Sequence, residues 1–134
     1  RRIRRTSCKN LLVQMKKSFL DIVEEALVNV DEVDCIQLKH AKDNEEDFIL
    51  IDSREREEWD ASRIPNSVHM SKGLIEKMVE ANIPDRDTKL IIYCQSGFRS
   101  VLACESIKRM GYNQVSSLKG GISEWQSSGF PIED

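Results

Sequence analysis

The chain has 134 residues, of which 40% are hydrophobic and 32% charged, and its formal net charge is −3. This length suits one domain with a single core, and the composition is that of a globular protein rather than a disordered one. A mildly acidic chain does not indicate a nucleic-acid partner, and no apolar window is long enough to insert into a membrane.

The amino-terminal segment combines a basic arm with a helical pattern. The first five residues, RRIRR, are basic and the chain does not begin with Met, so we expect a solvated arm of a longer or processed precursor. Contact with an anionic surface is the alternative. Apolar residues then recur at helical spacing, among them Leu12, Phe19, Val23 and Leu27. This pattern predicts an amphipathic helix within residues 11–30.

The rest of the chain alternates short apolar strands with helices. The predicted strands are an extended piece in DEVD, FILID at 48–52, a short strand around Val68, KLIIY at 89–93 and QVSSL at 114–118. The predicted helices lie at 35–42, where Asp34 would be the N-cap, and at 53–63, 73–82, 97–110 and 121–129. This order predicts a three-layer α/β/α fold, in which helices cover a mainly parallel central sheet, with an extra amino-terminal helix. Ligands of such sheets bind beyond the carboxyl ends of the strands.

The four cysteines are Cys8, Cys35, Cys94 and Cys104, and none forms a CxxC pair. The two histidines are far apart, so the sequence has no metal-ligand spacing, and we expect neither a metal nor a cofactor. Scattered cysteines in a domain of this size are typical of free thiols in a reducing compartment. We therefore expect a cytoplasmic protein, with a processed organellar form as the alternative.

Cys94 directly follows a predicted buried strand, and the stretch YCQSGFRS leads from it into a helix. Backbone N–H groups converge at such a junction, and the helix dipole adds positive potential, so the loop can stabilise a thiolate and an anion bound to it. Gly97 permits a positive φ, while Arg99 adds a cation and Ser96 and Ser100 add hydroxyl groups. The alternative is that Cys94 is only a small core residue. The polar, glycine-containing loop after it favours a nucleophile.

The loop YCQSGFRS resembles the active-site loop of rhodanese-type sulfurtransferases. Two further stretches are similar to signatures of that family, FILIDSREREEWDASRIPNSVHM and LKGGISEWQSSGFPIE. The matching positions in them are Asp52, Arg54, Glu57, Trp59, Ile64, Pro65, Gly120, Gly121, Trp125, Gly129, Phe130 and Pro131. Three motifs in the right order are more specific than one alone. The resemblance implies a rhodanese domain over residues 32–134, preceded at 1–31 by the basic arm and the helix.

The resemblance implies a sulfurtransferase that works through a Cys94 persulfide. The Cys94 thiolate would take the outer sulfur of a donor such as thiosulfate or a persulfide, and a cyanide or thiol acceptor would then remove it. The amides of residues 95–99 would stabilise the anions. Gln95, Ser96, Gly97, Phe98, Arg99 and Ser100 would form the anion-binding and persulfide-binding loop. Arg99 would either act as the loop cation or brace the loop against Asp52 or Glu57, and Asp52 and Arg54 are expected to form a supporting pair.

Departures from the family pattern and rival functions qualify this prediction. Gln95 and Ser96 stand where thiosulfate-using relatives often have positive charge, and Phe98 would contact a larger acceptor from the loop rim.

A persulfide carrier or regulatory module that passes sulfur to a partner protein is one alternative function. A cysteine-dependent phosphatase is another alternative. However, phosphatases that share the fold of the rhodanese family have five residues between the loop Cys and Arg, whereas this chain has four. Cys104 is expected to be a packing residue, and Cys35 to be half-buried.

Overall fold

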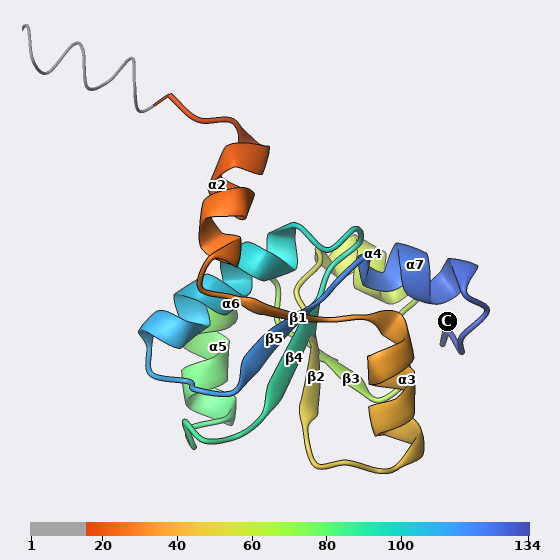
Figure 1. Cartoon of the computed structure of the whole chain (residues 1–134). Coiled ribbons are helices and arrows are strands. Elements are labelled where there is room, and N and C mark those ends of the chain that lie inside the picture. The colour runs from red at the N-terminus through yellow and green to blue at the C-terminus, as the bar shows by residue number, and fades with distance from the viewer. Residues whose placement is uncertain (1–15) are drawn as a thin grey trace, which may run out of the picture.

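The computed structural model describes residues 16–134 and has a five-stranded sheet at its centre (Figure 1). Its strands are β1 (Asp31–Val33), β2 (Ile49–Asp52), β3 (Ser67–His69), β4 (Leu90–Tyr93) and β5 (Val115–Leu118). Their order across the sheet is β1-β5-β4-β2-β3, and every neighbouring pair is parallel. The expected parallel sheet is therefore confirmed. Because β4 is the central strand, the loop after it lies at the middle of the carboxyl edge.

Helices cover both faces of the sheet, which confirms the expected three layers (Figure 1). The helices are α2 (Phe19–Leu27), α3 (Cys35–Asp43), α4 (Arg56–Ala61), α5 (Ile75–Asn82), α6 (Arg99–Arg109) and α7 (Gly121–Ser127). Side chains alternate along a strand, so β4 supplies both cores. Leu90 and Ile92 pack with α2, α5 and α6, whereas Ile91 and Tyr93 pack with α3 and α7. Burial on both faces explains why this strand is uniformly apolar.

The amino-terminal helix α2 docks on α6 as part of the same core. Val23 and Ala26 are buried in the cluster that contains Val101 and Ile107 of α6. A capping box fixes the start of α2, since the Ser18 hydroxyl accepts from the Asp21 amide and the Asp21 carboxylate accepts from the Ser18 amide. Residues 11–15 of the expected helix, the basic arm and Cys8 lie outside the described residues.

Helix caps agree with the local sequence elsewhere too. Asp34 is the N-cap of α3 and shares a capping box with Gln37, as expected from its position before Cys35. Cys35 itself is buried rather than half-buried, because its side chain turns into the core beside Leu38 and Trp125.

Within residues 16–134, no helix has the length and apolar character needed to cross a membrane.

Candidate active site

Cys94 is the first residue after β4, and its side chain lies at the centre of the carboxyl edge of the sheet. The neighbouring strands bring two other segments beside it, because Tyr93 pairs in register with Asp52 of β2 and Ile92 with Ser117 of β5. Only 1% of the Cys94 residue surface is exposed. The sheet register therefore brings the polar ends of β2 and β5 to the thiol, as expected for an α/β ligand site.

The Cys94 sulfur lies in a cradle of hydrogen-bond donors. Its Sγ accepts from the amide of Gly97 at 3.1 Å and from the amide of Ser100 at 3.3 Å. The Ser100 hydroxyl lies 3.3 Å from the same Sγ and 2.8 Å from the Ser117 hydroxyl, and both serines are buried. Several donors around one sulfur, at the amino end of α6, stabilise negative charge on it. This arrangement suits a thiolate nucleophile.

The amino end of α7 holds the other side of the loop. The amide of Ile122 donates to the Cys94 carbonyl at 2.9 Å, and the amide of Ser123 donates to the Gln95 carbonyl at 3.0 Å. This close approach requires glycine at position 121, where φ is +60° and a Cβ would lie 2.5 Å from the Gln95 carbonyl oxygen. The two loop carbonyls are thus bonded to α7, while the Gly97 and Ser100 amides face Sγ.

Arg99 begins α6 but its guanidinium bonds to α4. Its Nη1 and Nη2 donate to the two carboxylate oxygens of Glu58 at 3.1 and 3.2 Å. The brace expected at Asp52 or Glu57 is therefore made by Glu58 instead. Hydrogen bonds from Arg99 lower the pKa of Glu58, and the same bonds raise the pKa of Arg99. The cation next to the loop is thus offset by a carboxylate.

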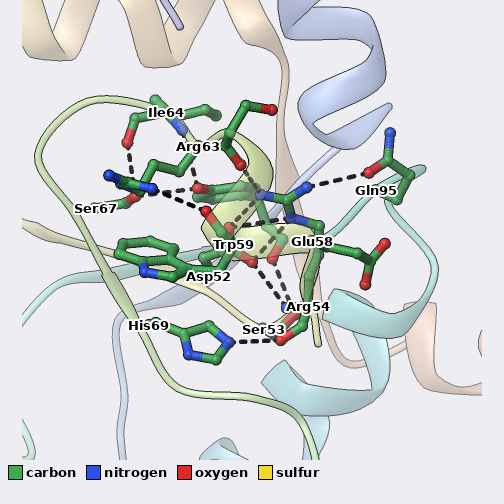
Figure 2. Close-up of polar contacts among 12 residues, drawn as sticks. Asp52, Ser53, Arg54, Glu58, Trp59, Arg63, Ile64, Ser67, His69 and Gln95 are labelled. Carbon is green, nitrogen blue, oxygen red and sulfur yellow. Dashed lines mark hydrogen bonds and ion pairs between the residues drawn. The ribbon is translucent and has the colours of Figure 1, made fainter. Parts of the chain in front are cut away.

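Asp52 and Arg54 form a buried ion pair that supports the loop from β2 (Figure 2). The Arg54 guanidinium donates to both Asp52 oxygens, with Nη2 at 2.8 Å, and the Arg54 amide donates to the same carboxylate. Arg54 Nη1 reaches the Gln95 side-chain oxygen at 3.3 Å, and Gln95 Nε2 donates to Ser123. Burial alone would lower the pKa of Arg54, but the hydrogen bond and charge of Asp52 raise it. The ion pair thereby fixes the side chain of Gln95, the first loop residue after Cys94.

A pocket of about 190 Å³ opens over the sulfur. Its lining residues are Phe19, Cys94, Gln95, Ser96, Phe98 and Arg99. A larger hollow of about 440 Å³ lies at the other end of β2, near Lys42, Phe48 and Asn66, and contains no thiol. The described residues contain no group of three or more His, Cys, Asp or Glu side chains arranged to hold a metal ion. Of these two hollows, the one beside Cys94 offers a thiol nucleophile.

Cys94 differs from the other two described cysteines in its surroundings. Burial raises the pKa of Cys35 to about 11 and also raises the pKa of Cys104, which packs inside α6. We expect iodoacetamide at pH 8 to modify Cys94 first, with Cys35 reacting appreciably only as the pH approaches 11. Peptide mass spectrometry of a Cys8→Ser variant would measure the rates. Equal rates at Cys35 and Cys94 would contradict this expectation.

The Glu58–Arg99 pair predicts a pH-dependent contribution to stability. The pKa of Glu58 is lowered in the folded protein, so the pair stabilises fully above the ordinary value of 4.5 and progressively less as the pH falls below it. Both side chains are about a third exposed, which limits the contribution to about 1 kcal/mol. Urea unfolding of wild type and Glu58→Gln should differ by up to this amount at pH 7, and the difference should shrink as the pH falls below 4.5. A constant difference across this range would argue against the pair.

Several contacts of the loop were not predicted from the sequence. The Ser100 amide donates to Sγ although the expected donors were residues 95–99, and Ser117 joins the cradle from β5. The position of Ser117 offered a signal, since it is a polar residue near the carboxyl end of a predicted parallel strand, the edge at which ligands bind. Phe19 lines the pocket from α2, and no local pattern indicates this long-range contact.

Comparisons with known proteins identify the family of this site. The model of the rhodanese-like domain matches residues 36–128. A sulfurtransferase from Allochromatium vinosum is 36% identical over 103 residues, which cover 77% of this chain and 94% of that protein. YrkF from Bacillus subtilis, provisionally named a sulfur carrier protein, is 31% identical over 97 residues, which cover 72% of this chain and 51% of that protein.

Among solved structures, a protein of unknown function from Rhodopseudomonas palustris, described as a possible tyrosine phosphatase, has a TM-score of 0.80 to this chain. It is 25% identical and the match covers 89% of this chain and 96% of that one. The matched family model spans the sheet from β2 to β5, the Cys94 loop and α7. The chain therefore belongs to the rhodanese-like domain family.

Proposed function

We propose that this protein is a sulfurtransferase that carries sulfane sulfur on Cys94. The observation that carries the proposal is the cradle in which the Gly97 and Ser100 amides donate to Sγ at the base of an open pocket. Family membership and the 36% identity to a sulfurtransferase support a sulfur-transfer role. The same donors that stabilise a thiolate would stabilise the persulfide anion that replaces it.

The proposed reaction has two displacements. The Cys94 thiolate attacks the outer sulfur of a donor, an S–S bond forms, and the old bond breaks with its electron pair on the leaving group, sulfite in the case of thiosulfate. A thiolate or cyanide then attacks the outer sulfur of the persulfide. The electron pair of the broken S–S bond returns to Cys94, and the acceptor leaves as a persulfide or as thiocyanate.

The charges around the pocket favour persulfide donors over thiosulfate. Of the described residues that line the pocket, Arg99 carries the positive charge, and Glu58 offsets it through two hydrogen bonds. Gln95 and Ser96 are neutral. Thiosulfate, which is a dianion, therefore gains little electrostatic stabilisation in this pocket. An alkyl persulfide needs less electrostatic stabilisation, because its reacting group carries a single negative charge.

Mass spectrometry of the intact protein tests the proposal. Incubation with glutathione persulfide should add about 32 Da, the mass of one sulfur, and cyanide or a thiol should remove it. The adduct should map to Cys94 and be absent from Cys94→Ala. Glu58→Gln should raise kcat/KM for thiosulfate roughly threefold to tenfold by freeing Arg99, and change that for a persulfide with an uncharged alkyl group, such as 2-hydroxyethyl persulfide, less than about twofold. No adduct with either donor would refute the proposal.

The other functions give different results in this experiment. An adduct that forms but transfers only to a protein thiol would identify a persulfide carrier or regulatory module. Hydrolysis of a phosphotyrosine peptide that requires Cys94 would identify a phosphatase, the activity suggested for the Rhodopseudomonas palustris protein. Phosphoryl transfer needs a free cation for the phosphate and an acid for the leaving group. The Glu58–Arg99 ion pair does not favour phosphoryl transfer, because Glu58 already binds the guanidinium of Arg99, the cation of the loop.

A further inference from the structure

Phe19 brings an aromatic ring to the Cys94 pocket from outside the matched family region. The family model begins at residue 36, whereas Phe19 is the first residue of α2. Its ring meets the ring of Phe98 edge to face, with centroids 6.5 Å apart and planes at 81°. Both residues line the pocket over the sulfur. We call these two side chains the aromatic wall.

The fold holds the aromatic wall in place. The capping box between Ser18 and Asp21 fixes the first turn of α2, immediately around Phe19. One turn later Val23 is buried, and Ala26 follows it into the core shared with α6. Phe98 is the N-cap of α6, so both rings start from the ends of helices that pack on each other. The helix caps and the packing of α2 on α6 therefore fix the backbone from which both rings start.

The aromatic wall exposes apolar surface in a pocket that also has polar lining residues. Phe19 is 47% exposed and Phe98 is 45% exposed, so each ring has about half its surface in water. The polar residues Gln95 and Ser96 line the same pocket. Covering a half-exposed ring with an apolar group is favourable in proportion to the area removed from water. A small anion such as cyanide gains nothing from this contact.

We propose that Phe19 is a specificity-determining residue, which with Phe98 selects thiol acceptors that carry an apolar group next to the sulfur. The proposal rests on the proposed function, since the acceptor takes sulfur from the Cys94 persulfide. The acceptor thiolate attacks the outer sulfur, the persulfide S–S bond breaks, and its electron pair returns to Cys94 Sγ. While this occurs the apolar group lies on the aromatic wall, and the contact favours transfer to that acceptor.

Discharge of the preloaded persulfide with three acceptors tests this selection. The acceptors are 2-phenylethanethiol, 2-mercaptoethanol and cyanide, and the rate of loss of the persulfide mass is measured in a single turnover. In Phe19→Ala, the second-order rate constant for 2-phenylethanethiol should fall about tenfold, as is typical for the loss of an apolar contact. The rate constants for the other two acceptors should stay within about twofold. Phe19→Leu should recover part of the loss.

Leu20→Ala is the matched control. Leu20 comes directly after Phe19 in the same helix and is also half-exposed, but it does not line the pocket. The Leu20→Ala variant should leave all three rate constants within about twofold of wild type. Circular dichroism should show that each variant keeps its fold. If Phe19→Ala changes the three rate constants equally, or if Leu20→Ala reproduces its effect, the proposal is wrong.

A second measurement separates the aromatic wall from sulfur transfer itself. Benzyl and methyl methanethiosulfonate modify the Cys94 thiol directly, without a persulfide. Phe19→Ala should slow the benzyl reagent about tenfold relative to the methyl reagent. If no persulfide forms but this preference is lost in Phe19→Ala, the proposed function fails while the apolar selection by Phe19 stands. An unchanged preference refutes the role of Phe19, whether or not sulfur is transferred.

Discussion

Replacing Cys94 by serine is expected to reduce sulfur-transfer turnover by at least about 10³-fold. Serine has nearly the same shape, so the Gly97 and Ser100 amides keep an acceptor at the base of the loop. Its hydroxyl is a far weaker nucleophile, and an oxygen at this position cannot form the persulfide that links the two displacements. Steady-state assays with glutathione persulfide and cyanide would measure the loss.

Cys104→Ala provides the control for this experiment. Cys104 is fully buried in α6 and its thiol has a raised pKa, so it is a packing residue and not a second nucleophile. The variant should lose about 1 kcal/mol of stability, as for removal of a small buried group, and keep near wild-type turnover at 25 °C. If Cys94→Ser kept more than a tenth of the wild-type turnover, a residue other than Cys94 would carry the sulfur.

Asp52→Ala is expected to destabilise the protein by about 3–5 kcal/mol, or to lower Tm by roughly 10–20 °C. Asp52 is fully buried and Arg54 is 3% exposed. Removing the carboxylate leaves a buried guanidinium with two remaining acceptors, the Ser62 carbonyl and the Gln95 side chain. The free energy of unfolding, measured by urea denaturation, would show the cost of the unpaired charge.

Two further variants show whether burial is the cause. Asp60→Ala removes one partner of the exposed Arg56–Asp60 pair in α4, and should cost less than about 1 kcal/mol. Asp52→Leu combined with Arg54→Met removes both buried charges, and should be more stable than Asp52→Ala because no unpaired ion remains. Equal losses in Asp52→Ala and Asp60→Ala would show that the buried pair contributes no more than a surface pair.

The sequence predicted the sheet and the nucleophile loop because their signals are local. KLIIY is apolar on both faces of a central strand, and Cys94, Gly97 and Arg99 all lie within the six residues after it. The pairing of Asp52 with Arg54 was also foreseen, since two residues at one strand end are close in any fold. The catalytic role of Cys94 and the supporting role of Asp52 are still predictions; Cys94→Ser tests the first through turnover, and Asp52→Ala tests the second through stability.

Contacts between distant elements could not be predicted in the same way. Glu57 and Glu58 are adjacent in the sequence, and only the rotation of α4 decides which one meets Arg99. The contact of Phe19 with Phe98 depends on how α2 lies across α6, which is set by the burial of Val23 and Ala26. Sequence spacing gives the apolar face of a helix but not the element that it covers.

The short strand β1 also protects the protein from self-association. It pairs with β5 at one edge of the sheet, and two of its three residues are the exposed acids Asp31 and Glu32. A brief, negatively charged edge is a poor template for a strand from another molecule. If the segment before α3 were removed, the largely buried β5 would become the outer strand, with its amide and carbonyl groups open to intermolecular pairing. The segment that precedes the matched family region therefore helps to keep neighbouring molecules apart.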